Sequence, residues 1–310
     1  MGSFISTASF VELPFRKKRA VSFGNTISFD NNVSDEEIIN TIVKSNCDRI
    51  QTTIEPSEEE ITILDKIYAK NPNIGFRLYS IFGPDADLSF LLKIKSLRNL
   101  YLDCHSGIKN IELLKELKLD MLSLSCFSVK NYSFLKDIDC NLKSLSIDLE
   151  DKTYKMDIND ILHIKGLENL EIRNVKKGLD KICEFNKLNS LLLRSIDIKD
   201  YRFLNNMNVR KLNLCFQKSE YFNTFGINEK IEEINLWRCP KLTDLSFLLQ
   251  FPNLKKITIK DQAKVTSVPD LKALTKLEEV YYFCNNDPEL SNSFNNNVKI
   301  YTWYNPCDED

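Results

Sequence analysis

The chain has 310 residues, with 42 Lys and Arg against 44 Asp and Glu and a formal net charge of −2. This balance argues against a general nucleic-acid surface, which needs a basic excess or stripe. The nine cysteines contain no C-x-x-C pair, so we expect a reducing cytoplasm in which they act as small apolar residues. No window approaches the ~18 apolar residues of a membrane span, and residues 1–15 lack the basic start and apolar run of a secretory signal.

Residues 1–33 alternate apolar and polar side chains in short runs, as β-strands do. The run from Val11 to Phe15 is the clearest of them. We expect two or three short strands that form a β cap for the structure behind them. The basic run Arg-Lys-Lys-Arg at 16–19 is interpreted as a solvated hairpin turn, with a nuclear or nucleic-acid-binding signal as the alternative.

Two helices are predicted in residues 34–96. Ser34 with Glu37, and then Ser57 with Glu60, have the spacing of a capping box, in which hydroxyl and carboxylate satisfy the first backbone N–H groups. Apolar residues then follow at helical spacing: Ile38, Ile39, Ile42 and Val43 in the first helix, and Ile61, Leu64, Ile67 and Tyr68 in the second. Strands near 49–54 and 75–79 come after the helices, so we expect two longer, degenerate repeats.

A repeat of 21 to 25 residues occupies the rest of the chain. One copy, 231–242, reads L-x-x-L-x-L-x-x-C-x-x-L with Ile allowed for Leu. The copies begin at Leu97, Leu119, Leu142, Leu167, Leu188, Val209, Ile231, Leu254, Leu277 and Val298. Positions four and six are also apolar from the first copy to the ninth, which predicts a short strand with alternate side chains buried. One such strand cannot bury its apolar side alone, so each copy needs neighbours.

This pattern resembles the leucine-rich repeat family over about residues 74–304, most closely its 22-residue internalin-type and phosphatase-regulator subclass. A second phrase supports the resemblance because it falls at matching places between strands: Asp87-Leu88-Ser89-Phe90-Leu91, Tyr132-Ser133-Phe134-Leu135, Tyr201-Arg202-Phe203-Leu204 and Asp244-Leu245-Ser246-Phe247-Leu248. The family usually carries Asn at position nine, where its side chain bonds neighbouring backbones. Here that position runs through His105, Phe127, Glu150, Val175, Ile196, Gln217, Cys239, Gln262 and Asn285. We therefore expect a solenoid less regular than the family's.

The resemblance implies an α/β fold: a leucine-rich repeat solenoid with a parallel, concave β-sheet and short helical or irregular convex segments. We expect one continuous solenoid domain made of four stretches. They are an N-terminal β cap at 1–33, degenerate helix-containing repeats at 34–96, regular repeats with a closing strand at 97–304, and a polar tail at 305–310.

The residues give little support for catalysis. His105 and His163 lie in different repeats, and no Gly-rich phosphate loop, H-E-x-x-H or G-x-S-x-G occurs. We expect no enzyme activity and no cofactor. Cys104 and Cys126 share position eight of adjacent repeats, about one strand spacing apart, so a disulfide or a metal pair is the alternative to two free thiols.

Positions three, five, seven and eight are expected to point out of the concave face. In the C-terminal half, large apolar groups stand at these positions with cations around them, and Trp, Tyr and Arg dominate binding hot spots. The predicted partner-binding residues are Arg173, Leu192, Arg194, Phe216, Trp237, Arg238, Lys260, Tyr281 and Phe283. The alternative is that the last strand or a C-terminal loop covers these aromatic residues. The N-terminal half of the face has small and acidic residues: Asp103, Ser123, Ser125, Ser144, Ser146 and Asp148.

We therefore expect a cytoplasmic, non-enzymatic scaffold that binds a partner protein on its concave face. Such repeats mostly serve as recognition scaffolds, so part of this expectation is analogy with the family. An inhibitor or immunity protein and a bacterial effector are two versions that the residues do not separate. The alternative is a nucleic-acid or phosphate-ligand binder that uses the Arg residues with stacking on Trp237.

Overall fold

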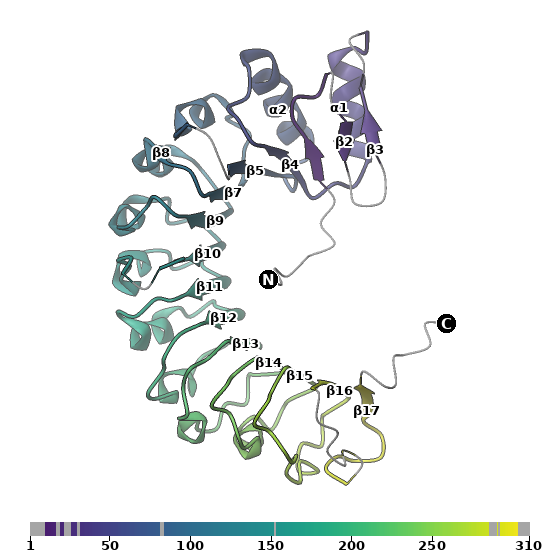
Figure 1. Ribbon diagram of the computed structural model, residues 1–310, viewed down its shortest axis with the longest axis vertical. Coiled ribbons are helices and arrows are strands. Elements are labelled where there is room, and N and C mark those ends of the chain that lie inside the picture. Colours follow the sequence, from purple (N-terminus) through teal and green to yellow (C-terminus); the bar gives the residue numbers. More distant parts are fainter. Residues whose placement is uncertain are drawn as a thin grey trace. The chain divides into compact units, whose positions relative to one another are not determined.

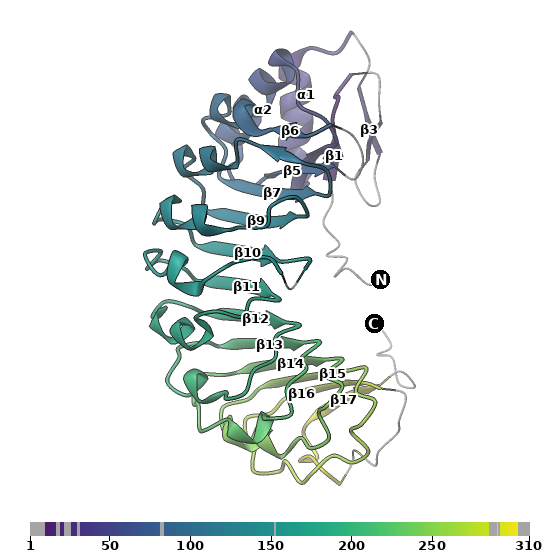
Figure 2. The ribbon, with the colours of Figure 1, turned by 60° about the vertical axis from the view of Figure 1, so that its left-hand side comes forward.

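The computed structural model describes residues 10–16, 19–21, 26–29, 32–80, 84–151, 153–284, 290 and 292–302. The chain divides into two compact units, Met1–Lys155 and Met156–Asp310. Within each unit the main strands follow one another along one side, and coiled segments lie on the other side (Figures 1 and 2). A single continuous solenoid domain, as expected from the sequence, stays a prediction.

The N-terminal unit has a parallel sheet in the order β1-β4-β5-β7-β9-β10. Its strands are β1 (Phe10–Glu12), β4 (Arg49–Thr52), β5 (Gly75–Ser80), β7 (Asn99–Cys104), β9 (Met121–Cys126) and β10 (Ser144–Asp148). Two small pairs stand apart from this sheet: β2 (Arg19–Val21) is antiparallel to β3 (Thr26–Ser28), and β6 (Ala86–Asp87) is parallel to β8 (Ile108–Lys109). The expected N-terminal strands are therefore present, and β1 extends the sheet beside β4.

The two predicted helices are α1 (Asp35–Lys44) and α2 (Glu58–Lys70). The Ser57 hydroxyl accepts from Glu60 N, and the Glu60 carboxylate accepts from Ser57 N at 2.9 Å, which completes the capping box. The Ser34 hydroxyl accepts from Glu37 N at 3.3 Å. Both helices bury the apolar side that their spacing predicted, including Ile38 and Leu64 at 0% exposure.

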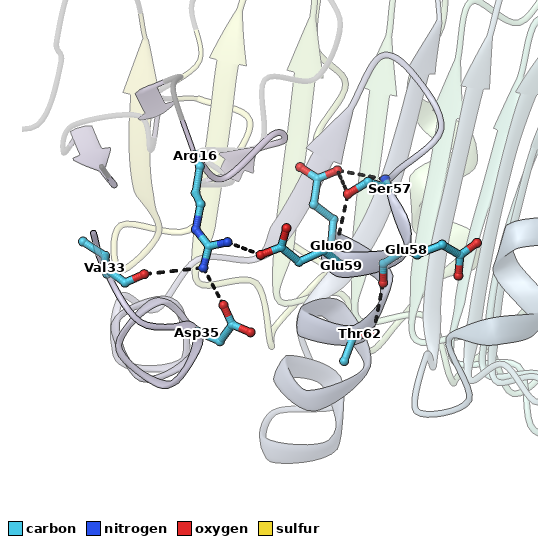
Figure 3. A network of polar contacts seen from close by, with 8 residues as sticks. All are labelled: Arg16, Val33, Asp35, Ser57, Glu58, Glu59, Glu60 and Thr62. Carbon is cyan, nitrogen blue, oxygen red and sulfur yellow. Dashed lines mark hydrogen bonds and ion pairs between the residues drawn. The ribbon is translucent and has the colours of Figure 1, made fainter. Parts of the chain in front are cut away.

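Arg16 lies four residues after β1 and links this stretch of the chain to the starts of both helices (Figure 3). Its guanidinium forms ion pairs with Asp35 at 2.5 Å and with Glu59, and it also donates to Val33 O at 3.4 Å. The acidic residues belong to the first helical turns, where negative charge offsets the positive end of the helix dipole. The first residue of the basic run is therefore a paired structural cation, and 17–18 lie outside the described residues.

The C-terminal unit has a parallel sheet of strands β11 to β17, each hydrogen-bonded to the next in chain order. The strands are β11 (Asn169–Arg173), β12 (Ser190–Arg194), β13 (Lys211–Cys215), β14 (Glu233–Trp237), β15 (Lys256–Lys260), β16 (Glu279–Phe283) and β17 (Lys299–Thr302). Every residue at positions one, four and six of the copies that begin at Leu167 through Leu277 is at most 2% exposed. This confirms the period and the inward positions of the leucine-rich repeat.

The segments between strands are short 3-10 helices: η1 (Leu88–Lys93), η2 (Ile111–Glu116), η3 (Ser133–Asp137), η4 (Ile158–Ile161), η5 (Leu179–Glu184), η6 (Arg202–Leu204), η7 (Phe222–Thr224) and η8 (Ser246–Gln250). Several begin with a side chain that accepts from the backbone N–H two residues on. Asp87 accepts from Ser89 N and Asp244 from Ser246 N, both at 2.9 Å. Such local bonds favour a tight turn over a longer helix. The convex phrases thus mark helical segments, as the resemblance implied.

An inward side chain at the end of a strand replaces the family's asparagine ladder. It donates to the backbone carbonyl at the level of position six in the preceding repeat. The pairs are Cys104 to Leu78 O (3.8 Å), Cys126 to Leu102 O (3.4 Å), Gln217 to Leu193 O (2.6 Å), Cys239 to Leu214 O (3.5 Å) and Cys284 to Ile259 O (3.9 Å). Thiols are weak donors, so packing contributes most of the stability at the cysteine positions.

In three copies the inward residue at the end of the strand stands at position eight, one position earlier than the repeat predicted. Cys104 and Cys126 are fully buried, and Cys284, which we expected on the outward face, is 4% exposed. Strands β7 and β9 extend through their cysteines, so the next residues turn outward. His105 is exposed and its ring stacks on the half-buried Phe127 ring at 4.2 Å between centroids.

Asn228 joins neighbouring repeats just before β14. Its side-chain amide donates to Leu204 O at 2.6 Å and Met207 O at 3.2 Å, and its side-chain oxygen accepts from Lys230 N at 2.8 Å. The residue is 2% exposed, so water cannot replace these bonds. Asn223 lies close by in sequence but is exposed.

Replacing Asn228 should therefore destabilise the protein. For Asn228→Ala we expect the free energy of unfolding to fall by about 2–4 kcal/mol, because buried backbone groups lose their partners. Urea unfolding followed by circular dichroism measures this. Asn223→Ala is the matched control and should change stability by less than about 0.5 kcal/mol. Equal stability of the two variants would contradict this role for Asn228.

Candidate partner-binding surface

The outward face of the C-terminal unit consists of strand positions three, five and seven together with position eight. Position seven forms one row across the sheet, in which successive members are Cα partners on adjacent strands: Arg173, Arg194, Cys215, Trp237, Lys260 and Phe283. Adjacent strands lie about 4.8 Å apart, so each side chain stands beside the next. The register used to select the candidate residues is thus the register of the sheet.

Most side chains of the outward face are half-exposed, but two on β13 are buried. Arg194, Trp237 and Lys260 are half-exposed, whereas Asn213 and Cys215 are 8% and 1% exposed. Cys215 lies between the longer side chains of Arg194 and Trp237, and Asn213 lies between Leu192 and Asn235. Burial raises the pKa of the Cys215 thiol to about 12, so it is protonated and poorly nucleophilic at neutral pH.

Position eight has a left-handed backbone in five consecutive copies: Asn174 (φ 57°), Ser195 (φ 56°), Phe216 (φ 54°), Arg238 (φ 48°) and Asp261 (φ 52°). Each of these residues donates its backbone N–H to the position-seven carbonyl of the next strand. For Phe216 the acceptor is Trp237 O at 2.7 Å. A bulky residue rarely adopts this conformation, so the strand bonds and the side-chain packing must hold it there.

Five of these side chains form the arginine–aromatic cluster: Arg194, Phe216, Trp237, Arg238 and Asp261. The Phe216 and Trp237 rings pack edge to face with centroids 4.6 Å apart. The guanidinium carbons of Arg194 and Arg238 lie 5.1 and 5.5 Å from the Phe216 centroid. Asp261 Oδ2 accepts from Trp237 Nε1 at 3.0 Å and from Arg238 at 3.1 Å. The carboxylate therefore holds the indole and one arginine in place.

The tyrosine cluster lies on β15, β16 and β17 and contains Lys256, Lys260, Glu279, Tyr281, Phe283 and Tyr301. Tyr281 stacks on Tyr301 with centroids 4.5 Å apart and lies 6.1 Å from Phe283. Lys256 Nζ is 4.3 Å from the Tyr281 centroid, and Lys260 Nζ is 5.4 Å from the Phe283 centroid. Glu279 accepts from the Tyr281 hydroxyl at 3.2 Å.

The remaining candidates, Arg173 and Leu192, lie at the β11–β12 side of the arginine–aromatic cluster. Arg173 is the Cα partner of Arg194, and Leu192 is the Cα partner of the buried Asn213. Strand β17 continues the sheet beside β16, and its Tyr301 is half-exposed. As far as 302, the last strand therefore extends the outward face, and its Tyr301 covers one side of the Tyr281 ring.

The predicted binding residues did not include Asp261, Lys256, Glu279 and Tyr301, although the repeat already places Asp261 at position eight of the outward face. The two carboxylates were left out because the candidates were large apolar and cationic side chains. What the sequence could not supply is the pairing between them, because cation–ring and carboxylate contacts depend on side-chain rotamers.

The outward face of the N-terminal unit also holds arginine–tyrosine contacts, which its serines did not indicate. Arg49 lies 4.4 Å from the Tyr101 ring centroid, and Arg77 lies 4.6 Å from that of Tyr79. Asp103, one of the predicted acidic residues, accepts from Arg77 at 2.5 Å. The acidic charge expected there is thus partly neutralised within the unit.

The part of the chain that the structure describes holds neither a Cys104–Cys126 disulfide nor a cluster of metal ligands. Cys104 and Cys126 are free thiols on paired positions, and their mutual hydrogen bond, with burial, raises the pKa of Cys126 well above its usual value. No group of three or more potential metal ligands gathers within the described ranges. The two α-helices have 10 and 13 residues, and no helix in the described part of the chain is long and apolar enough to cross a membrane.

The sequence matches no family model and no curated protein. Among solved structures, the chain is similar to internalin C2 of Listeria monocytogenes, with 19% identity and a TM-score of 0.43 over 73% of this chain and 84% of that one. A second Listeria monocytogenes internalin is 17% identical, with a TM-score of 0.48 over 81% of this chain and 77% of that one. A leucine-rich repeat protein of Leptospira interrogans is 15% identical, with a TM-score of 0.43 over 76% of this chain and 70% of that one. The leucine-rich repeat architecture of this chain follows from its own period, strand register and buried positions.

Loss of the Asp261 carboxylate should loosen the Trp237 indole and expose it more to solvent. The chain has two tryptophans, so in a Trp303→Phe background the emission reports Trp237 alone. We expect Asp261→Gly, which tolerates the left-handed backbone of this position, to increase acrylamide quenching of this emission and to change stability by less than about 1 kcal/mol, as for other exposed charged contacts. Asp180→Ala, an exposed acid on η5, is the control. Unchanged quenching would show that Asp261 does not hold the indole.

Proposed function

We propose that this chain is a non-enzymatic protein-binding scaffold whose partner docks on the outward face of the C-terminal unit. The arginine–aromatic cluster carries the proposal. Phe216 and Trp237 are half-exposed on a sheet face, and Arg194 and Arg238 lie beside the same ring. Tryptophan and arginine contribute strongly to hot spots because each buries a large area and keeps a polar group for pairing.

The side chains of this face are already held in place by their own contacts, and this supports the same proposal. Protein binding loses about 0.5–1.5 kcal/mol for each long side chain that it must immobilise. Here Trp237 and Arg238 already share the Asp261 carboxylate, and Tyr281 is already stacked on Tyr301. A partner therefore meets side chains that are held in position, on strands that are hydrogen-bonded along the whole unit.

Two biological roles fit a scaffold of this kind in the cytoplasm. One is an inhibitor or immunity protein that covers the active surface of another protein. The other is a bacterial effector that binds a protein of the host. Both need a rigid face with a hot spot and no catalytic group, and the protonated Cys215 in the middle of the row suits that requirement.

A nucleic-acid or phosphate ligand is the second candidate, favoured by the arginines next to aromatic rings. The acids on the same face weigh against it. Arg238 pairs with Asp261 at 3.1 Å and Lys256 with Glu279 at 3.3 Å. A polyanion would have to compete with these carboxylates, so we place it second.

The test is a pull-down from lysates of the source cells and of their natural competitors or hosts, with wild type beside a Trp237→Ala/Arg194→Ala variant. We expect a protein that wild type retains and the variant loses. With the identified partner, the affinity should fall at least about thirtyfold, since a single hot spot contributes about 2 kcal/mol. Circular dichroism and a melting curve establish that both variants fold.

The matched control is Arg202→Ala/Leu249→Ala, which removes an arginine and a large apolar group from exposed positions on η6 and η8. It should retain the partner like wild type. Equal retention by all three proteins would contradict the site on the outward face. Capture of nucleic acid alone, with release at high salt, would favour the second candidate, because phosphate contacts give a steep salt dependence.

A further inference from the structure

The cations on the outward face from β12 to β16 fall into two groups. Three have a carboxylate partner on a neighbouring strand: Arg238 with Asp261 (3.1 Å), Lys256 with Glu279 (3.3 Å) and Lys211 with Glu233 (3.4 Å). Arg194 and Lys260 have no ion pair among the described residues, and the side-chain contact of each is an aromatic ring. The face therefore carries two uncompensated positive charges at defined places.

Both charges are held in position and partly shielded from water. Arg194 lies over Phe216, and its Nε atom is buried without a hydrogen-bond acceptor. Lys260 lies over Phe283 and is half-exposed. Partial burial lowers the effective dielectric constant around a charge and so strengthens its attraction for an anion.

The sheet sets the distance between the two charges. Arg194, Cys215, Trp237 and Lys260 are successive Cα partners in the position-seven row. Three strand steps of about 4.8 Å put the Cα atoms of the two cationic residues about 14 Å apart, with Trp237 between them. An extended chain advances about 3.3 Å per residue, so about four residues cover this distance.

We infer that the face recognises an acidic, extended protein segment with two carboxylates about four residues apart and an apolar side chain between them. One carboxylate meets Arg194, the other meets Lys260, and the apolar side chain packs on Trp237. The segment runs across the strands, along the position-seven row. This inference rests on the proposed function, because it uses the same face and specifies what binds there.

A nucleic acid fits this pattern less well. A nucleic-acid strand in a duplex carries a charge about every 3.4 Å, so about four phosphates would pass over a row that offers two unpaired cations. The Asp261 carboxylate, which is bonded to Trp237 Nε1 at 3.0 Å, would repel the phosphates in the middle. An acidic peptide can place an uncharged residue at that point.

The test uses the full chain and a fluorescein-labelled Gly-Ser peptide with glutamate at positions three and seven and phenylalanine at position five. Fluorescence anisotropy at low salt gives the affinity. We expect this peptide to bind about tenfold more tightly than the same peptide with both glutamates replaced by glutamine. A peptide with its glutamates at adjacent positions should bind about as weakly as the glutamine peptide, because it reaches one cation at a time.

Two variants assign the contacts. Arg194→Gln and Lys260→Gln should each weaken the glutamate peptide about three- to tenfold and leave the glutamine peptide unaffected. Lys211→Gln is the matched control, since this cation already pairs with Glu233, and it should change binding less than about twofold. Equal affinity for the glutamate and glutamine peptides, or no binding up to millimolar concentration, would overturn the inference. Tighter, salt-sensitive binding of an oligothymidylate would overturn it as well.

These outcomes are separable from those of the pull-down. If a partner protein is lost with Trp237→Ala/Arg194→Ala while the glutamate and glutamine peptides bind alike, the scaffold proposal stands and the acidic segment is wrong. If the partner is retained by that variant, the site itself is wrong, whatever the peptides do. A partner whose affinity falls on Lys260→Gln, and falls further with salt, supports both.

Discussion

Every copy of the repeat depends on its neighbours to bury positions one, four and six. A five-residue strand such as β12 cannot bury its apolar side within its own copy alone, so much of its stability comes from the strands on both sides. Burial of a leucine contributes about 1.5–3 kcal/mol, and these positions are almost fully buried throughout β11 to β16. The same requirement fixes the register of the sheet. The outward residues are aligned in rows because the inward residues must be.

Much of this follows from the sequence, because apolar periodicity and capping spacings are properties of single residues at fixed intervals. The strands, the helices α1 and α2 and the convex helical segments all appear where those patterns predicted them. The inward polar residue at the end of each strand was harder to predict, because Cys or Gln makes the bond to the preceding repeat that Asn makes in the family. His105 and Cys284 were misplaced by one position because a strand can continue for one more residue before it turns, and the spacing of leucines does not report where that happens.

The candidate surface was predicted in part for a related reason. The sequence placed Trp237 and Arg194 on one face because they share a repeat position, and the strand register agrees. The central role of Asp261 was missed because it depends on one carboxylate oxygen that two neighbouring donors share. Such a contact is decided by rotamers and backbone angles at the end of the strand. The division of cations into paired and unpaired ones has the same origin, since a count of Lys and Arg cannot distinguish them.

The left-handed backbone at Phe216 has a consequence for how this protein can change. A residue with a bulky side chain in that region is strained by about 1–3 kcal/mol, and glycine adopts it without strain. Substitution by glycine would therefore relieve the backbone but remove the ring on which both arginines rest. The stability of the fold and the proposed binding surface therefore make opposite demands on this position. In the proposed function, the strain at Phe216 is stability given up for the ring that supports the two arginines.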